Sequence, residues 1–180
     1  MTNKDRLKSL VKSFRYAFRG LSYCIKTQRN MRIHLVAAAA VMLFSVIYGL
    51  TAIQYAILFL GICFVIVTEM LNTAVEFAIN IQTDSYDQRA GAAKDIAAGA
   101  VLVATAAAVV TGLILFGDIA KLRETFYTIV STVYYIIPAV LTVIFGLLFI
   151  FKGISMFERK SRSDKKVEKE KVKIYRPKYK

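Results

Sequence analysis

Four apolar blocks dominate the chain, and each is long enough to cross a lipid bilayer. They occupy residues 33–50, 54–80, 92–117 and 127–151. The hydrocarbon layer of a bilayer is about 30 Å thick, and a helix of about 20 residues crosses it. Because this layer offers no water to unpaired backbone groups, such blocks fold as helices. The sequence therefore predicts an all-α membrane protein with four spans.

The distribution of charge predicts how these spans are oriented. The chain has 180 residues and a net charge of +13. Nine of its 25 Lys and Arg residues precede position 33 and twelve follow position 151, so both basic blocks flank spans. The positive-inside rule accounts for this pattern, and we expect no nucleic-acid partner. Both termini are predicted to be cytoplasmic.

The segments outside the spans also have a characteristic composition. Residues 5–26 place apolar side chains at helical spacing, with Lys and Arg largely elsewhere, which predicts an amphipathic helix on the membrane surface. An ordinary packing helix is the alternative. Residues 118–126 are expected to form an outer loop, and 152–180 a basic cytoplasmic tail. We predict one domain over 1–120 and an extra transmembrane helix within 121–151.

The second block ends in the polar sequence TEMLNTAVEFAIN, residues 68–80. At 100° per residue, Asn72, Thr73 and Glu76 lie within about 60° of Glu69, so all four share one stripe of a helix. A carboxylate at membrane depth is costly and indicates function. A structural hydrogen-bond seam between helices is the alternative, and it suits Asn72 and Thr73 better than the two glutamates.

Further polar residues are expected at the same membrane surface. Lys94 and Asp95 fall in the first turn of the third block, where Asp95 is otherwise a favourable residue for a helix start. The first block follows Gln28, Arg29, Asn30 and Arg32, whose simpler interpretation is as snorkelling anchors. The loop 82–91 adds Asp84, Tyr86, Asp87 and Arg89, and on its own it would be a solvated loop. His34 is interpreted as a packing residue.

Acids and bases at a membrane surface suit a reaction between a lipid and a water-soluble anion. Glu76 and Asp95 are candidates to hold a divalent cation, and Lys94 to meet phosphate oxygens. Glu69 is placed to accept a proton from a lipid hydroxyl. Phosphoryl transfer needs these parts, and the chain has no P-loop motif.

Four motifs resemble the bacterial integral-membrane diacylglycerol kinase family, especially its undecaprenol kinase branch. They are F-R-x-A-F-x-G-L at 14–21, R-N-M-R-I-H-L at 29–35, E-x-L-N-T-A-x-E at 69–76 and A-K-D-x-A-A-G-A-V-L at 93–102. The resemblance implies a homotrimer in a bacterial plasma membrane, with active sites shared between subunits. It implies that ATP and Mg²⁺ are used to phosphorylate a lipid alcohol, with undecaprenol the first candidate and diacylglycerol the alternative.

The resemblance also implies roles for individual residues. Glu69 is the expected catalytic base, Asn72 a positioning residue, and Glu76 a Mg²⁺ ligand. The residues expected to contact the nucleotide are Tyr16, Ser85, Tyr86, Asp87, Lys94 and Asp95. Gln28 stands where the family usually has a metal-binding glutamate, and its amide oxygen can coordinate Mg²⁺ without supplying charge.

Two other classes of function compete with a kinase. One is a non-catalytic membrane protein whose metal binding is impaired by Gln28. The other is a channel or proton-coupled transporter, since membrane acids occur there too. The acids lie towards one surface and not at the midplane, which favours the kinase.

Overall fold

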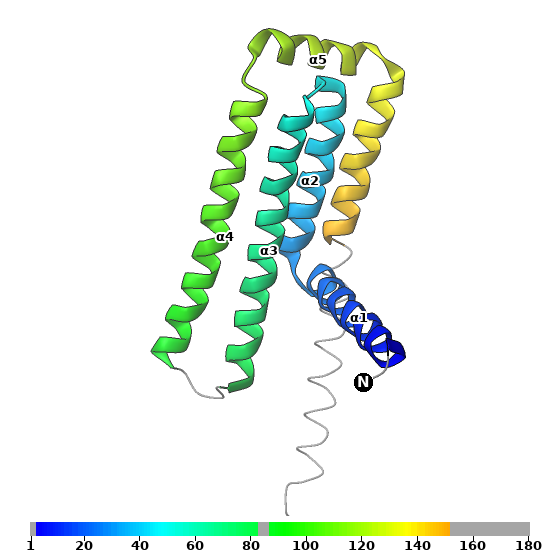
Figure 1. Cartoon of the computed structure of the whole chain (residues 1–180). Helices are drawn as coiled ribbons and strands as arrows, with labels where there is room; N and C mark the ends of the chain where they lie inside the picture. Colours follow the sequence, from blue (N-terminus) through cyan, green and yellow to red (C-terminus); the bar gives the residue numbers. More distant parts are fainter. Residues whose placement is uncertain (1–2, 83–86, 152–180) are drawn as a thin grey trace, which may run out of the picture.

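The computed structural model describes residues 3–82 and 87–151, which form helices and no strand (Figure 1). The helices are α1 (Asn3–Thr27), α2 (Arg29–Tyr48), α3 (Ala52–Gln82), α4 (Gln88–Leu115), α5 (Ile119–Ser131) and a further helix, Val133–Phe151, called the fourth span. Within the described ranges, α2, α3, α4 and the fourth span are long and apolar enough to cross a membrane. The predicted all-α, four-span fold is confirmed.

A tight turn joins α2 to α3. Gly49 adopts a left-handed conformation with φ 69° and donates its N–H to the carbonyl of Ser45, which ends α2. The Thr51 N–H then donates to Gln54 Oε1 at 2.9 Å, and the Gln54 N–H donates to Thr51 Oγ1 at 3.4 Å. This reciprocal pair satisfies free N–H groups at the start of α3, as a capping box does.

Helix α1 is attached to the bundle near its C-terminal end. Arg32 of α2 donates from one guanidinium nitrogen to the carbonyls of Ile25 and Lys26, at 3.2 and 3.1 Å. The rings of Tyr23 and Phe77 meet edge to face with centroids 5.9 Å apart. Arg32 is only 3% exposed, so the simpler interpretation of this residue as a snorkelling anchor is wrong. It binds the last carbonyls of α1, which lack partners within that helix.

The stretch 118–126 differs from its predicted loop, because it forms most of helix α5. The Asp118 carboxylate caps this helix by accepting from the Lys121 N–H at 3.0 Å. Apolar residues at 119, 122, 126 and 129 recur at helical spacing. Thr132 is extended, with φ −115° and ψ 114°, so the last span begins at Val133 and not at 127.

Figure 1 shows how the helices are arranged. Helix α5 lies across one end of the bundle and connects α4 to the fourth span, which stands beside α2. A Cβ built on Gly146 of the fourth span would lie 2.6 Å from Cγ1 of Val36, so glycine permits this close approach. The end opposite α5 holds α1, the end of α3 and the start of α4.

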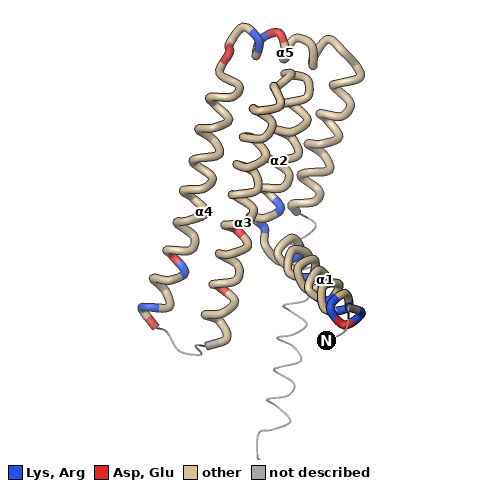
Figure 2. Tube along the Cα trace, in the orientation of Figure 1, with Lys and Arg blue, Asp and Glu red and all other residues tan. Residues whose placement is uncertain are grey.

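Charged residues gather at the two ends of the bundle (Figure 2). Most lie on α1 and at the starts of α2 and α4, a few lie on α5, and the middle of the bundle has almost none. The acidic positions of α3 are the ones that extend from this charged end towards the middle. The predicted gathering of polar residues at one membrane surface is therefore present in the fold.

Candidate active site

Helix α3 carries the stripe of polar residues that the sequence predicts. Glu69, Asn72 and Thr73 are 2%, 8% and 4% exposed, while Glu76 is half-buried. The Thr73 hydroxyl donates to the backbone carbonyl of Glu69 at 2.9 Å. Asn72 Nδ2 donates to Glu76 Oε1 at 3.4 Å, which links the amide to the second carboxylate. The stripe faces the protein interior, as expected.

Two oxygen atoms of this stripe are buried and unpaired. Within the described part of the chain, Glu69 Oε2 and Asn72 Oδ1 have no hydrogen-bond partner. Leaving such a group unpaired costs about 1–3 kcal/mol, and more when it is charged. A structural seam would pair these atoms, so the burial favours a functional role for Glu69 and Asn72.

A cavity of about 280 Å³ opens beside these oxygens. Its lining residues come from α2, α3 and α4, and include Asn30, His34, Glu69, Asn72, Ala98 and Thr105. Polar groups from three helices thus meet in one space within the membrane-spanning part of the chain. The cavity can admit a small polar group together with an apolar one.

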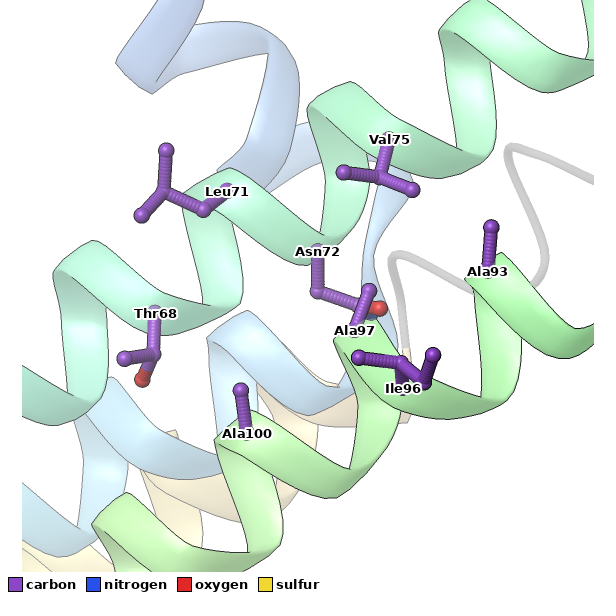
Figure 3. A pocket seen from close by; sticks show the side chains of 8 residues that line it. All are labelled: Thr68, Leu71, Asn72, Val75, Ala93, Ile96, Ala97 and Ala100. Atoms are coloured by element: carbon purple, nitrogen blue, oxygen red, sulfur yellow. The ribbon is translucent and has the colours of Figure 1, made fainter.

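Asn72 also borders an outer hollow between α3 and α4 (Figure 3). Its volume is about 360 Å³, and its walls are Thr68, Leu71, Asn72, Val75 and, on α4, Ala93, Ile96, Ala97 and Ala100. Figure 3 shows the Asn72 side chain directed from α3 towards Ile96 and Ala97 of α4. Small side chains on α4 leave this face open.

The start of α4 brings Lys94 to the polar stripe. Lys94 Nζ donates to Asn80 Oδ1 at 2.7 Å, and Asn80 lies about one turn beyond Glu76 on α3. The ammonium therefore lies close to the polar end of α3. Asp95 is exposed and has no described bond that fixes it to this stripe. Lys94, and not the neighbouring Asp95, makes the described side-chain hydrogen bond from α4 to α3.

Asp87 has a structural role in this fold. Its carboxylate accepts from the Arg89 N–H at 2.8 Å and so caps α4. A nucleotide contact from Asp87 would have to share that carboxylate. Ser85 and Tyr86, the other predicted nucleotide residues of this loop, lie outside the described residues, as does Asp84.

Tyr16 lies on the exposed face of α1, with 53% of its surface accessible. The Lys12 ammonium and Arg19 guanidinium lie 5.8 and 5.9 Å from the centroid of its ring. An aromatic ring between two cations suits a nucleotide, whose base can stack and whose phosphates are anionic. No described contact joins Tyr16 to the Glu69 cavity within one chain.

The fit of a metal ion can be judged from the donor atoms. Among the described residues, no group of three or more His, Cys, Asp and Glu side chains is placed to hold a metal. Oxygen donors are nevertheless present, because Glu76, Asn72 and Glu69 share one stripe and two of their oxygens are unpaired. Gln28 lies just before α2 and makes no capping bond with its side chain. Carboxylate and amide oxygens are the ligands that Mg²⁺ prefers.

No functional role was predicted from the sequence for two residues that line the Glu69 cavity. Thr105 belongs to an alanine-rich stretch of α4, and a threonine in a helix usually bonds its own backbone, so its position carries no signal. His34 was predicted to be a packing residue. Only the meeting of three helices places both on the Glu69 cavity.

Comparison with known proteins agrees with the resemblance of the four motifs. The model of the prokaryotic diacylglycerol kinase family matches residues 15–116, more than half of the chain. The chain belongs to this family. The predicted family is therefore confirmed, and the matched range contains α2, α3, α4 and the part of α1 that follows residue 14.

Curated relatives of this family carry two different names. A diacylglycerol kinase of Synechocystis is 47% identical over 58% of this chain and 60% of its own length. An undecaprenol kinase of Bacillus subtilis is 38% identical over 63% of this chain and 93% of its own. A diacylglycerol kinase of Escherichia coli is 28% identical over the same shares. These names fit the predicted enzyme class, a lipid kinase. No solved structure matches significantly.

Proposed function

We propose that this multi-pass membrane protein transfers the γ-phosphoryl group of ATP to the hydroxyl of a membrane lipid. The observation that carries the proposal is Glu69, a buried carboxylate with an unpaired oxygen in a cavity inside the spans. Undecaprenol is the acceptor that the sequence motifs favour. Diacylglycerol is the second candidate, because the Synechocystis relative of 47% identity carries that name.

In this proposal Glu69 is the general base. As the lipid oxygen bonds to the γ-phosphorus, the hydroxyl proton passes to Glu69 Oε2 and the bond to the β-phosphate oxygen breaks, which releases ADP. Burial of the carboxylate excludes water that would otherwise compete as acceptor. The oxygen is free to receive the proton because no described group donates to it.

The neighbours of Glu69 would position the reactants. Asn72 donates to Glu76 and keeps its own oxygen unpaired, so it can orient a hydroxyl next to the base. Lys94 would meet phosphate oxygens after exchanging its bond to Asn80. Tyr16, Ser85, Tyr86, Asp87 and Asp95 are proposed nucleotide contacts.

Glu76 and Gln28 are the proposed ligands of Mg²⁺. A bound Mg²⁺ supplies positive charge that offsets the negative charge of the transferring phosphoryl group. Glu76 contributes a half-buried carboxylate, and Gln28 contributes a neutral amide oxygen. The reduced ligand charge predicts weaker metal binding than two carboxylates would give.

We extend the proposal to topology and assembly. Residues 1–120 would form the catalytic domain in a bacterial plasma membrane, with both termini cytoplasmic. The apolar hollow between α3 and α4, with the buried Asn72 at its edge, supports a neighbouring subunit there, as a homotrimer with shared sites requires. Analytical ultracentrifugation in detergent measures the number of subunits.

The deciding experiment is transfer of labelled γ-phosphate from ATP to undecaprenol and to dioleoylglycerol in mixed micelles, with Mg²⁺ titrated. We expect chloroform-soluble label that depends on Mg²⁺. Absence of label at every Mg²⁺ concentration, with a folded oligomer, would favour the non-catalytic class. Ion flux into liposomes containing the protein would favour the transporter class.

A further inference from the structure

Thr105 differs from the other threonines of the described helices. Seven of them donate their hydroxyl to a carbonyl of their own helix: Thr27, Thr68, Thr73, Thr111, Thr125, Thr128 and Thr142. Thr105 Oγ1 is buried and has no partner in the described part of the chain. Since the bond to its own helix is the usual arrangement, this hydroxyl is left for another group.

Thr105 and His34 stand where two cavities meet. Both residues line the Glu69 cavity. Both also line a second cavity of about 240 Å³, which lies between α2, α3 and α4 and extends as far as Phe116. Phe116 is the C-cap of α4, three residues before α5 begins, and on α3 the lining runs over 58–66, before Glu69. This second cavity therefore lies on the far side of the pair from Glu69. We call His34 and Thr105 the neck.

The second cavity suits a hydrocarbon chain. Its walls are almost entirely apolar and include Ala37, Ala38, Leu58, Gly61, Val65 and Gly112. A Cβ built on Gly61 or Gly112 would meet nothing within 4 Å, so both glycines face open space. The cavity lies within the spans, where lipid chains are the available apolar ligands.

We propose that the neck selects the acceptor lipid by the chemical group that follows its reacting hydroxyl. With the hydroxyl at Glu69 and the chain in the second cavity, the next few atoms of the lipid lie between His34 and Thr105. An acylglycerol places an ester carbonyl there, which can accept from the Thr105 hydroxyl and from an imidazole N–H. A prenol places only hydrocarbon there. This inference rests on the proposed lipid kinase function.

The neck therefore favours an acylglycerol over a prenol, against the preference drawn from the motifs. A prenol leaves the Thr105 hydroxyl buried and unpaired, whereas an ester satisfies it. The loss of one such bond corresponds to about tenfold in selectivity. The hydroxyl, the phosphoryl donor and the base are the same for both acceptors, so the reacting groups at Glu69 do not distinguish them.

The test is the ratio of kcat/KM for dioleoylglycerol to kcat/KM for undecaprenol. Thr105→Val removes the hydroxyl and nearly keeps the shape, and it is expected to lower this ratio about tenfold. His34→Leu is also expected to lower this ratio. Thr142→Val in the fourth span is the matched control, because its hydroxyl already donates to the Pro138 carbonyl and it borders neither cavity.

A second variant tests the chain cavity. Gly112→Leu extends a side chain into the space beyond the neck, and its Cβ would meet nothing within 4 Å. Its kcat/KM for dioleoylglycerol should fall several-fold more than its kcat/KM for dihexanoylglycerol. Equal losses for both lipids would mean that the chain does not enter this cavity.

The outcomes distinguish a failure of the proposed selectivity of the neck from a failure of the proposed kinase function. An unchanged ratio in Thr105→Val, with normal activity, overturns the neck and leaves the kinase intact. If the wild-type protein uses only dioleoylglycerol, Thr105→Val should gain measurable transfer to undecaprenol. Wild-type use of undecaprenol alone overturns the neck. No transfer to any lipid overturns the proposed function itself.

Discussion

The Lys121 ammonium lies 4.5 Å from the centroid of the Tyr48 ring and donates to the Gly49 carbonyl at 3.0 Å. These contacts fasten α5 to the turn between α2 and α3. They also give a structural role to a cation at the end of the bundle opposite α1. Cation–π attraction and a charge-assisted bond hold it there, so the charge has a structural partner.

Removing this contact should loosen α5 from the bundle. We expect Lys121→Met to lower the free energy of unfolding by about 1 kcal/mol, because one cation–π pair and one hydrogen bond are lost. Thermal unfolding in detergent measures the change. Arg123→Met removes a neighbouring exposed charge and should leave stability within about 0.5 kcal/mol of wild type. Equal stability of both variants would show that Lys121 does not fasten α5.

Glu69→Gln should abolish phosphoryl transfer while the protein still folds and assembles. The amide keeps the size of the side chain but cannot take the hydroxyl proton, and loss of a general base costs about 10²–10⁴-fold in rate. Transfer of labelled phosphate gives the rate, and light scattering in detergent gives the mass. Glu124→Gln, on the exposed surface of α5, is the control for loss of an acid. Full activity of Glu69→Gln would remove its assignment as base.

Gln28→Glu should strengthen the dependence on Mg²⁺. A second carboxylate beside the nucleotide phosphates adds charge to the proposed ligand set, so half-maximal activity should need several-fold less Mg²⁺. The measurement is activity against Mg²⁺ concentration at fixed ATP. Gln88→Glu makes the same charge change at the exposed start of α4 and should leave the titration unchanged. An identical titration for Gln28→Glu would place residue 28 outside the metal site.

The close approach of Gly146 to Val36 predicts a suppressible defect. Gly146→Ala puts a Cβ within 2.6 Å of Val36 Cγ1 and should destabilise the protein by about 1–3 kcal/mol. Adding Val36→Ala removes the clashing methyl groups and should restore most of the loss. Thermal unfolding of the single and double variants measures this, with Gly20→Ala, which meets nothing within 4 Å, as the control. A lack of restoration would show that the two side chains do not meet.

The Gly146→Ala variant also tests whether the fourth span takes part in catalysis. If residues 1–120 carry the activity, Gly146→Ala should keep the wild-type kcat at a temperature where it remains folded. A large loss of kcat in folded protein would assign the fourth span a role at the site.

The helical, membrane-spanning character of this protein and the polar stripe on α3 can be predicted from the sequence alone. Both follow from local rules: the length of apolar blocks sets the spans, and the helical period places Glu69, Asn72 and Thr73 on one face. The resemblance of the four motifs likewise predicted the family, because such a resemblance depends only on residue types and their spacing. The helical period of 119–131 was equally present, but 118–126 was predicted to be a loop between spans and 127–131 to belong to the last span.

Which side chains from different helices meet depends on how the helices pack in three dimensions. Arg32 reads as a surface anchor until α1 brings its last carbonyls within reach. His34 and Thr105 are distant in the chain and come to line one cavity only because α2 and α4 both pack against α3. Their chemistry depends on burial and on unpaired atoms. These are properties of the space between helices, and no local pattern encodes that space.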